Sequence, residues 1–159
     1  MRRHTKEIQD MESIIGLLRT THVGRLGTVG RDGYPMIKPL NFVYDGMKIY
    51  FHSAKEGEKI EDIVRDGRIC FEADAPLGYN EARSQPCEAT YFYRSVIIKG
   101  RAALVTDKGE RLHAFKLLMD KYQPGGGYGA FRDDKLRITA VIRIDIEEMT
   151  GKENISRSA

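Results

Sequence analysis

A regular alternation of apolar and polar side chains between residues 137 and 149 constrains the fold more than any other feature of the sequence. Apolar residues occupy every second position from Ile138 to Ile146, and most positions between them are threonine, arginine or aspartate. Successive side chains of a strand point to opposite faces of its sheet. The pattern therefore predicts a strand with one buried face and one solvated face.

Five other segments have the composition and length of strands, which makes six strands in total. They span residues 23–29, 36–44, 47–53, 68–75 and 90–105. Residues 30–33 form a predicted turn, Asp45-Gly46 predicts a two-residue hairpin, and Gly100 predicts a bulge in the long fifth strand. Pro39 has no N–H for the ladder, so its strand should lie at an edge, at a bulge, or beside something other than a strand.

Three segments have the signals of helices. Asp10 precedes an apolar face with helical spacing in residues 11–18, and two S/D-x-x-E capping boxes begin at Ser53 and Asp107. Residues 76–88 and 123–131 are predicted loops. Because the helices do not alternate regularly with the strands, the order predicts a mainly β fold, a closed or partly closed antiparallel barrel with flanking helices.

Length and composition fit a single domain over residues 1–159. The net charge is only +3, and 26 basic residues are dispersed among 23 acidic ones without a block, which argues against nucleic-acid binding. No apolar run approaches the roughly 20 residues of a membrane span, and the N-terminus has no apolar signal core. We therefore expect a cytoplasmic protein without a membrane partner.

The two cysteines do not suggest a metal site. Cys70 and Cys87 lie 17 positions apart and outside any CxxC or Cys/His cluster. Cys70 stands in an apolar run, which predicts a buried structural thiol. We expect no bound metal.

The stretch YFHSAKEGEK, residues 50–59, has the residue types of an anion site. If Ser53 caps a helix, the first backbone N–H groups have no intrahelical partner, and the helix dipole adds positive charge there. Lys55 and Lys59 would share one helix face, and His52 adds a donor. A phosphate can bind such a site, although the P-loop spacing of nucleoside triphosphate sites is absent. The same residues also fit a solvated capping box with surface lysines.

The segment GYPMIKPLNFVYDGMKIYFHSAKEGEKIEDIVRDGRICFE resembles the core of the pyridoxamine 5'-phosphate oxidase-like, FMN-binding split-barrel superfamily. The similarity continues in order through GRLGTV, YRSVIIKGRAALV and AVIRIDIEEMTGK, and covers nearly the whole chain. Within the superfamily, the sequence is most similar to the nitroimidazole-resistance (Nim-type) flavoproteins. The resemblance implies a six-stranded antiparallel split β-barrel and a homodimer that binds FMN between its subunits.

The resemblance also assigns flavin-contacting positions. Lys59 matches the basic position that holds the flavin phosphate, and Ser53 lies in the strand end that meets the phosphate or ribityl chain. The backbone of Lys38, Pro39, Leu40 and Asn41 matches the strand beside the isoalloxazine ring. This match explains the proline, because its missing N–H is harmless where a ligand and not a strand lies beside it. Ser95 matches a polar flavin-contacting position, and His52 is a flavin contact and the candidate catalytic residue.

The implied activity is a flavin-dependent reduction of small electron-poor substrates such as nitroaromatics, with a nicotinamide nucleotide or another reductant as donor. His52 would handle the substrate, although a structural role or a role as phosphate donor fits it equally well. The C-terminus EMTGKENISRSA lacks the Trp/Arg arrangement that binds substrate phosphate in the pyridoxamine phosphate oxidases, so vitamin B6 oxidation is not expected. The alternative is a non-catalytic flavin- or haem-binding, or haem-degrading, split-barrel protein.

Overall fold

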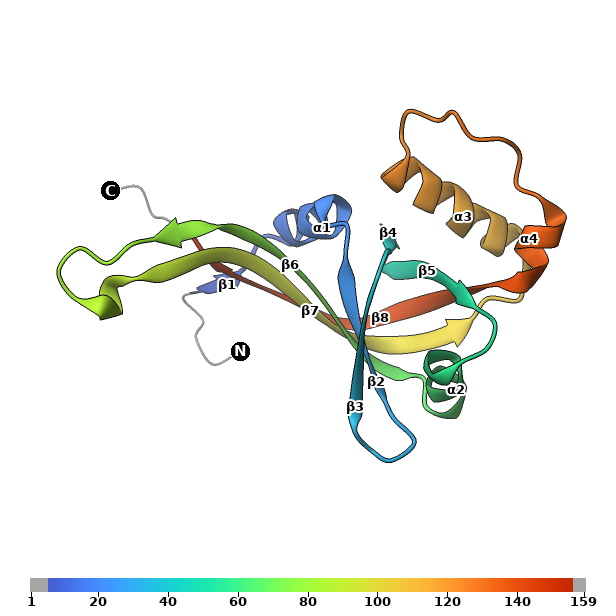
Figure 1. Ribbon diagram of the computed structural model, residues 1–159, viewed down its shortest axis with the longest axis horizontal. Helices are drawn as coiled ribbons and strands as arrows, with labels where there is room; N and C mark the ends of the chain where they lie inside the picture. The colour runs from blue at the N-terminus through green and yellow to red at the C-terminus, as the bar shows by residue number, and fades with distance from the viewer. Residues whose placement is uncertain (1–5, 156–159) are drawn as a thin grey trace.

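Eight antiparallel strands form one sheet in the computed structural model, which describes residues 6–155 (Figure 1). The strands are β1 (Glu7–Ile8), β2 (Gly24–Val29), β3 (Pro35–Leu40), β4 (Val43–Asp45), β5 (Lys48–Ala54), β6 (Arg68–Asn80), β7 (Thr90–Leu104) and β8 (Thr139–Asn154). The helices are α1 (Met11–Thr20), α2 (Glu58–Arg65), α3 (Lys108–Tyr122) and α4 (Asp133–Ile138), and a short 3-10 helix spans Pro86–Glu88.

The order of the strands explains why the sheet closes only partly. Across the sheet the order is β3-β2-β6-β7-β8-β5-β4, and β1 pairs separately with β8. The two end strands, β3 and β4, are joined by only Asn41 and Phe42. The two edges of the sheet therefore meet at this short connection and remain unpaired elsewhere. The predicted mainly β class and antiparallel split β-barrel are confirmed.

The structure has eight strands where six were predicted. One of the two additional strands is β1, which is too short to carry a periodic signal. The other arises because residues 36–44 form two strands, β3 and β4, and not one. Between them, the Phe42 N–H donates to the hydroxyl of Tyr122 at 2.9 Å and thus leaves the strand ladder.

The predicted hairpin is confirmed, with its turn one residue later than expected. Asp45 pairs with Lys48, so Gly46 and Met47 occupy the two turn positions. Both have positive φ, 51° and 66°. Two residues with positive φ are the mark of a type I′ turn, whose twist matches that of the flanking strands.

Alternating side chains fill the interior of the barrel, as the sequence pattern predicted. The largest buried side chains include Phe42, Phe51, Phe71, Ile98 and Ile142. Phe42 and Phe71 meet edge to face, with ring centroids 4.9 Å apart. α1 adds its apolar face to this cluster, and its start is fixed by Asp10, which accepts a hydrogen bond from the Ser13 N–H at 2.9 Å.

A second apolar cluster lies on the opposite face of the sheet, under α3. Val141 interrupts the polar side of β8 and packs there with Tyr50 of β5 against Ala114 and Leu118. Asp107 caps α3 by accepting from the Glu110 N–H at 2.8 Å. The outer side of β8 is therefore covered where α3 lies on it and solvated elsewhere.

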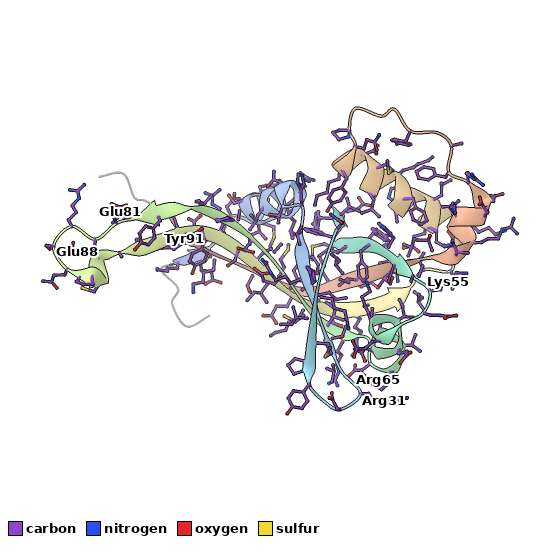
Figure 2. The ribbon with its side chains drawn as sticks, viewed as in Figure 1. Arg31, Lys55, Arg65, Glu81, Glu88 and Tyr91 are labelled. Atoms are coloured by element: carbon purple, nitrogen blue, oxygen red, sulfur yellow. The ribbon has the colours of Figure 1, made fainter. Side chains whose placement is uncertain are left out.

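A buried carboxylate attaches α2 to the barrel. Asp62 is 1% exposed, accepts from the Thr28 hydroxyl of β2 at 3.0 Å, and pairs with Arg65 at 2.7 Å. Arg65 also donates to the Val29 carbonyl, and Figure 2 shows it beside the β2–β3 turn that carries Arg31. Burial alone would raise the pKa of Asp62, but the hydrogen bonds from Arg65 and Thr28 outweigh it and lower the pKa.

Strands β6 and β7 continue beyond the barrel as a two-stranded arm (Figure 1). The predicted loop at residues 76–88 is wrong for its first part, because β6 runs to Asn80. A register shift between Pro76 and Gly78 lets pairing resume beyond the proline. Figure 2 shows Tyr91 on the arm, near the tip that carries Glu81 and Glu88.

Two further expectations concern Gly100 and Cys70. The predicted bulge is confirmed by a register shift between Lys99 and Gly100 in the pairing of β7 with β8. The predicted burial of Cys70 is wrong, because the alternation along β6 places this side chain on the outer face of the sheet, where it is exposed. Among residues 6–155, no helix has the length and apolar character that crossing a bilayer requires.

We predict that Asp62→Ala lowers the free energy of unfolding by about 2–3 kcal/mol, because it leaves the buried Thr28 hydroxyl without a partner and Arg65 without its carboxylate. Glu61→Ala, at an exposed position of the same helix, should change it by less than about 0.5 kcal/mol. Chemical denaturation of both variants measures the difference. Equal stability of the two variants would contradict this account of α2.

The pH dependence of this contribution follows from the lowered pKa of Asp62. The stabilisation is present above the pKa of an unfolded aspartate, about 3.9, and is lost as the pH falls through the folded value. The stability difference between wild type and Asp62→Ala should therefore shrink in acid below about pH 4.

Candidate functional site

The unpaired strand edges of the split barrel border a gap, which is the candidate site. β3 pairs only with β2, so its other edge is free. On the other side, β4 pairs with residues 48–50 of β5, whereas the following residues up to Ala54 pair only with β8. α2 follows β5 directly. Backbone groups of β3 and of the second half of β5 thus face the gap without a strand between them.

The chain enters α2 through Gly57, and the predicted helix cap at Ser53 is wrong. Ser53 belongs to β5, where it pairs with Ala140, and α2 begins at Glu58. Pairing with β8 holds Ser53 in the ladder, so it cannot adopt the role of a cap. Gly57 takes φ 115° and ψ 164°, a conformation that favours glycine, and it provides no side-chain cap.

His52 and Ser53 lie on opposite faces of the sheet, because they are consecutive residues of one strand. Ser53 shares the inner face of the barrel with Phe51, whereas His52 shares the outer face with Tyr50, under α3. The His52 ring lies 6.4 Å from the ring of Phe115. The two side chains therefore border the site from opposite faces of the sheet and cannot donate hydrogen bonds together to one anion.

Two lysines meet at the end of the gap. Lys38 of β3 reaches across to α2 and donates to the carboxylate of Glu58 at 2.5 Å. Lys59 lies with its Nζ 5.4 Å from the centre of the Phe51 ring and has no carboxylate partner within residues 6–155. Partial burial and the charge of Lys38 lower the pKa of Lys59. Lys59 thus carries a positive charge without a counter-ion.

The positive charge extends from Lys59 to the neighbouring groups. Partial burial and the charge of Lys59 lower the pKa of His52, so its imidazole is mainly neutral near pH 7. The N–H groups of Glu58 and Lys59 belong to the first turn of α2 and have no intrahelical acceptor. Lysine, open amides and a helix N-terminus together attract an anion.

The predicted ring-contacting segment borders the gap along β3 and just after it. Lys38 and Leu40 point toward the barrel interior, and Pro39 lies on the exposed side of an edge strand. The expectation that Pro39 lies at an edge is therefore confirmed. Asn41 follows the strand, and its side chain donates to the carbonyl of His22 at 3.3 Å.

The structure does not bring Ser95 to the other predicted residues within one chain. Ser95 lies on β7 opposite Asp74 of β6, and β7 is separated from β3 by β6 and β2. Three strand spacings correspond to about 14 Å. Its side chain also belongs to the outer face, because the neighbouring Val96 is fully buried inside the barrel.

Sequence reasoning missed the aromatic side chains near His52. Phe115 of α3 lies 6.1 Å from Phe131, which lies 6.1 Å from Tyr128, measured between ring centroids. Phe131 and Tyr128 belong to the connection after α3, which the sequence predicted as a loop. Their aromatic character at this position was the available signal. Within the described part of the chain, no cluster of three histidine, cysteine or acidic side chains has a geometry suited to a metal.

Several solved structures share this architecture. A candidate 5-nitroimidazole antibiotic resistance protein from Bacteroides thetaiotaomicron is 26% identical, with a TM-score of 0.80, 92% of this chain covered and 86% of the other. An FAD-binding protein from Mesorhizobium loti is 25% identical, with a TM-score of 0.66 and coverage of 92% and 96%. The flavocytochrome Anf3 from Azotobacter vinelandii is 24% identical, with a TM-score of 0.86 and coverage of 98% and 72%, and supports the fold alone.

Comparison at the level of sequence gives the family. Among curated proteins, none matches this chain. The sequence profile described as pyridoxamine 5'-phosphate oxidase matches residues 10–153. This range includes every strand of the barrel except β1 and the last residue of β8, all four α-helices and all the residues that border the gap. The chain therefore belongs to the pyridoxamine 5'-phosphate oxidase family of split-barrel proteins.

Proposed function

We propose that the protein binds FMN in the gap between β3, β5 and α2 and uses it to reduce small electron-poor compounds, such as nitroaromatics, with a nicotinamide nucleotide as donor. The observation that carries the proposal is Lys59, a lysine with no carboxylate partner within residues 6–155, beside the open amides of α2. The names of two similar structures, a candidate nitroimidazole resistance protein and an FAD-binding protein, support the same class of activity.

The residues at the end of the gap fit a flavin phosphate. Lys59 and the N–H groups at the start of α2 would hold its oxygens. Ser53 lies on the same face of β5 as Phe51, above whose ring Lys59 extends, so its hydroxyl can reach the same anion without capping the helix. Lys38 would add charge while remaining bound to Glu58. Lys55 lies outside α2 and does not share a helix face with Lys59.

The two edges of the gap would position the rest of the cofactor. The β3 edge, from Lys38 to Leu40 and on to Asn41, provides an extended backbone against which a flat ring can lie, and at Pro39 no N–H competes for space. FMN would supply the electron-accepting ring that the side chains of the chain lack. His52, neutral near pH 7, would orient the substrate through a hydrogen bond. The aromatic side chains near His52 would offer an apolar surface to the substrate.

We also propose that the protein acts as a homodimer, because the outer face of the sheet beside the gap carries exposed apolar side chains. Ile37 of β3 is 67% exposed and Ile97 of β7 is 47% exposed, and the ion pair of Arg25 with Glu72 lies on the same face between their strands. The neighbouring Val96 and Ile98 are buried in the barrel and cannot contribute to such an interface. Ser95 lies on the same outer face, so a second copy packed there would bring its own Ser95 toward the gap.

We predict that Lys59→Ala weakens FMN binding by about 10- to 100-fold, the value of one charge-assisted hydrogen bond. Riboflavin has no phosphate and should bind wild type and variant with similar, low affinity. Lys55→Ala, which removes an equal charge two residues before Gly57, should leave both affinities unchanged. Fluorescence titration of both flavins measures this. Equal losses for FMN and riboflavin would place the phosphate elsewhere.

Reductase activity has its own test. FMN-loaded protein under anaerobic conditions should lose the visible band of oxidised flavin when NADH or NADPH is added, and a nitroaromatic compound should restore the band. His52→Ala should slow the second step more than the first, because His52 is proposed to orient the substrate. A bound flavin that neither nucleotide reduces would refute the reductase. A Soret band after haem addition, with haem breakdown, would instead support the haem alternative.

The dimer should sediment at twice the 18.1 kDa of one chain at micromolar concentration. Ile97→Arg would place a charge in the centre of the proposed interface and should give monomers with weaker FMN binding. Met11→Arg, at an exposed apolar position of α1, should remain dimeric. A wild-type protein that sediments as a single chain would contradict the proposal.

A further inference from the structure

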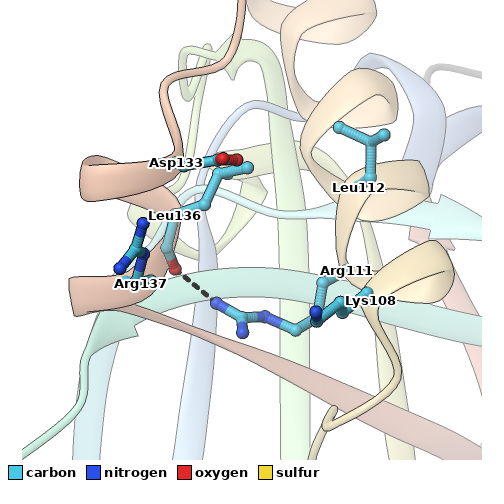
Figure 3. Close-up of a pocket in the computed structure, with 6 residues that line it drawn as sticks. All are labelled: Lys108, Arg111, Leu112, Asp133, Leu136 and Arg137. Atoms are coloured by element: carbon cyan, nitrogen blue, oxygen red, sulfur yellow. Dashed lines mark hydrogen bonds between the residues drawn. The ribbon is translucent and has the colours of Figure 1, made fainter.

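A cavity of about 540 Å³ lies between α3 and α4, outside the gap (Figure 3). Its lining residues come from these two helices: Lys108, Arg111, Leu112, Asp133, Leu136 and Arg137. None of the predicted flavin-contacting residues lines it. Its volume lies within the range of pockets that bind cofactor-sized molecules, roughly 300–1,000 Å³.

The cavity has an excess of positive charge. Lys108, Arg111 and Arg137 face a single acidic residue, Asp133. Neither Lys108 nor Arg137 has a carboxylate partner among residues 6–155. A ligand that brings negative charge would therefore find cations that the protein itself leaves uncompensated.

Arg111 gives the cavity a fixed wall. Its guanidinium donates to the carbonyls of Leu136 at 2.5 Å and Thr139 at 2.8 Å, and so ties α3 to the end of α4 and the start of β8. Its Nε is fully buried and has no hydrogen-bond partner within residues 6–155, so Arg111 holds the wall and leaves contact with a ligand to Lys108 and Arg137.

The apolar part of the cavity lies apart from most of its charge. In Figure 3, Leu112 on α3 and Leu136 on α4 face the cavity from opposite sides, Lys108 and Arg111 lie below them, and Asp133 and Arg137 lie beside Leu136. A matching ligand has a flat apolar part and an anionic part. Nucleotides have this combination, and Asp133 can accept hydrogen bonds from ribose hydroxyls as acidic residues do in other nucleotide sites.

The cavity lies close to the gap along α3. Phe115, whose ring is 6.4 Å from that of His52, follows Leu112 by three residues, about one helical turn. Lys108 and Phe115 are seven residues apart, which corresponds to about 10 Å along the helix axis. An extended dinucleotide can span this separation, with one half in the cavity and the other beside His52.

We propose that the cavity binds the adenosine-diphosphate half of the nicotinamide dinucleotide that reduces the flavin. The proposal rests on the reductase function proposed above, and it adds the site of the electron donor. The phosphates lie against Lys108 and Arg137, and the adenine lies between Leu112 and Leu136. The nicotinamide then extends past Phe115 toward the flavin.

Calorimetric titration of FMN-loaded protein with ADP-ribose, which lacks the nicotinamide, tests the cavity directly. The double variant Lys108→Ala/Arg137→Ala should bind ADP-ribose about 10- to 100-fold more weakly than wild type. The matched control Lys116→Ala/Lys135→Ala removes one exposed lysine from each helix, outside the cavity, and should bind as wild type does. Arg111 is kept in all variants because it holds α4. Absence of ADP-ribose binding to wild type, or equal binding by both double variants, would overturn the proposal.

Flavin reduction separates this proposal from the reductase function. The cavity variant should need about 10- to 100-fold more NADH or NADPH for half-maximal reduction, with an unchanged rate at saturation. Reduction with unchanged half-saturation in the cavity variant would overturn the cavity assignment and leave the reductase standing. Cavity-dependent ADP-ribose binding without flavin reduction by either nucleotide would overturn the reductase and support the cavity as a nucleotide site.

Discussion

The buried contact between Asp62 and Thr28 is the constraint on which the candidate site depends. β3 and β5 have no hydrogen bonds to one another, so strand pairing across the gap cannot fix the position of the segment that follows β5. Asp62 fixes it by holding α2 against β2, with Arg65 as its counter-ion. Because Lys59 lies on the same helix, three residues before Asp62, this contact also sets where the unpaired charge stands relative to the gap.

The gap brings together positively charged side chains whose mutual repulsion is unfavourable while no ligand is bound. Lys59 is partly buried beside Lys38, and their mutual repulsion together with burial lowers the pKa of Lys59. Glu58 balances one of the two lysines. An anion at the start of α2 would relieve the remaining repulsion, and such stored electrostatic cost is typical of binding sites. The cavity between α3 and α4 repeats the pattern, because Lys108 and Arg137 have no carboxylate partner within residues 6–155.

Local signals in the sequence predicted the elements whose ends they determine. Asp10 and Asp107 cap α1 and α3. The alternation of apolar and polar residues predicted β8. Each of these signals acts within a few residues and can therefore be recognised in the sequence. The cap at Ser53 failed because its competitor, Ala140 on β8, is distant in sequence. The opposite faces of His52 and Ser53, in contrast, follow from the predicted strand over residues 47–53, since consecutive residues of a strand point to opposite faces. The separation of Ser95 from the other residues, and the aromatic side chains near His52, depend on tertiary packing that no local pattern encodes.

The central claim is that a flavin phosphate binds beside Lys59 and Lys38 at the start of α2. The pKa of His52, which partial burial and the charge of Lys59 lower, tests it most directly. A negative charge close to His52 favours its protonated form, so the pKa should rise when FMN binds. Proton NMR titration of the His52 ring, identified with His52→Gln, measures it with FMN, with riboflavin and without ligand. The account predicts a rise with FMN alone. An unchanged pKa with bound FMN, or an equal rise with riboflavin, would contradict it.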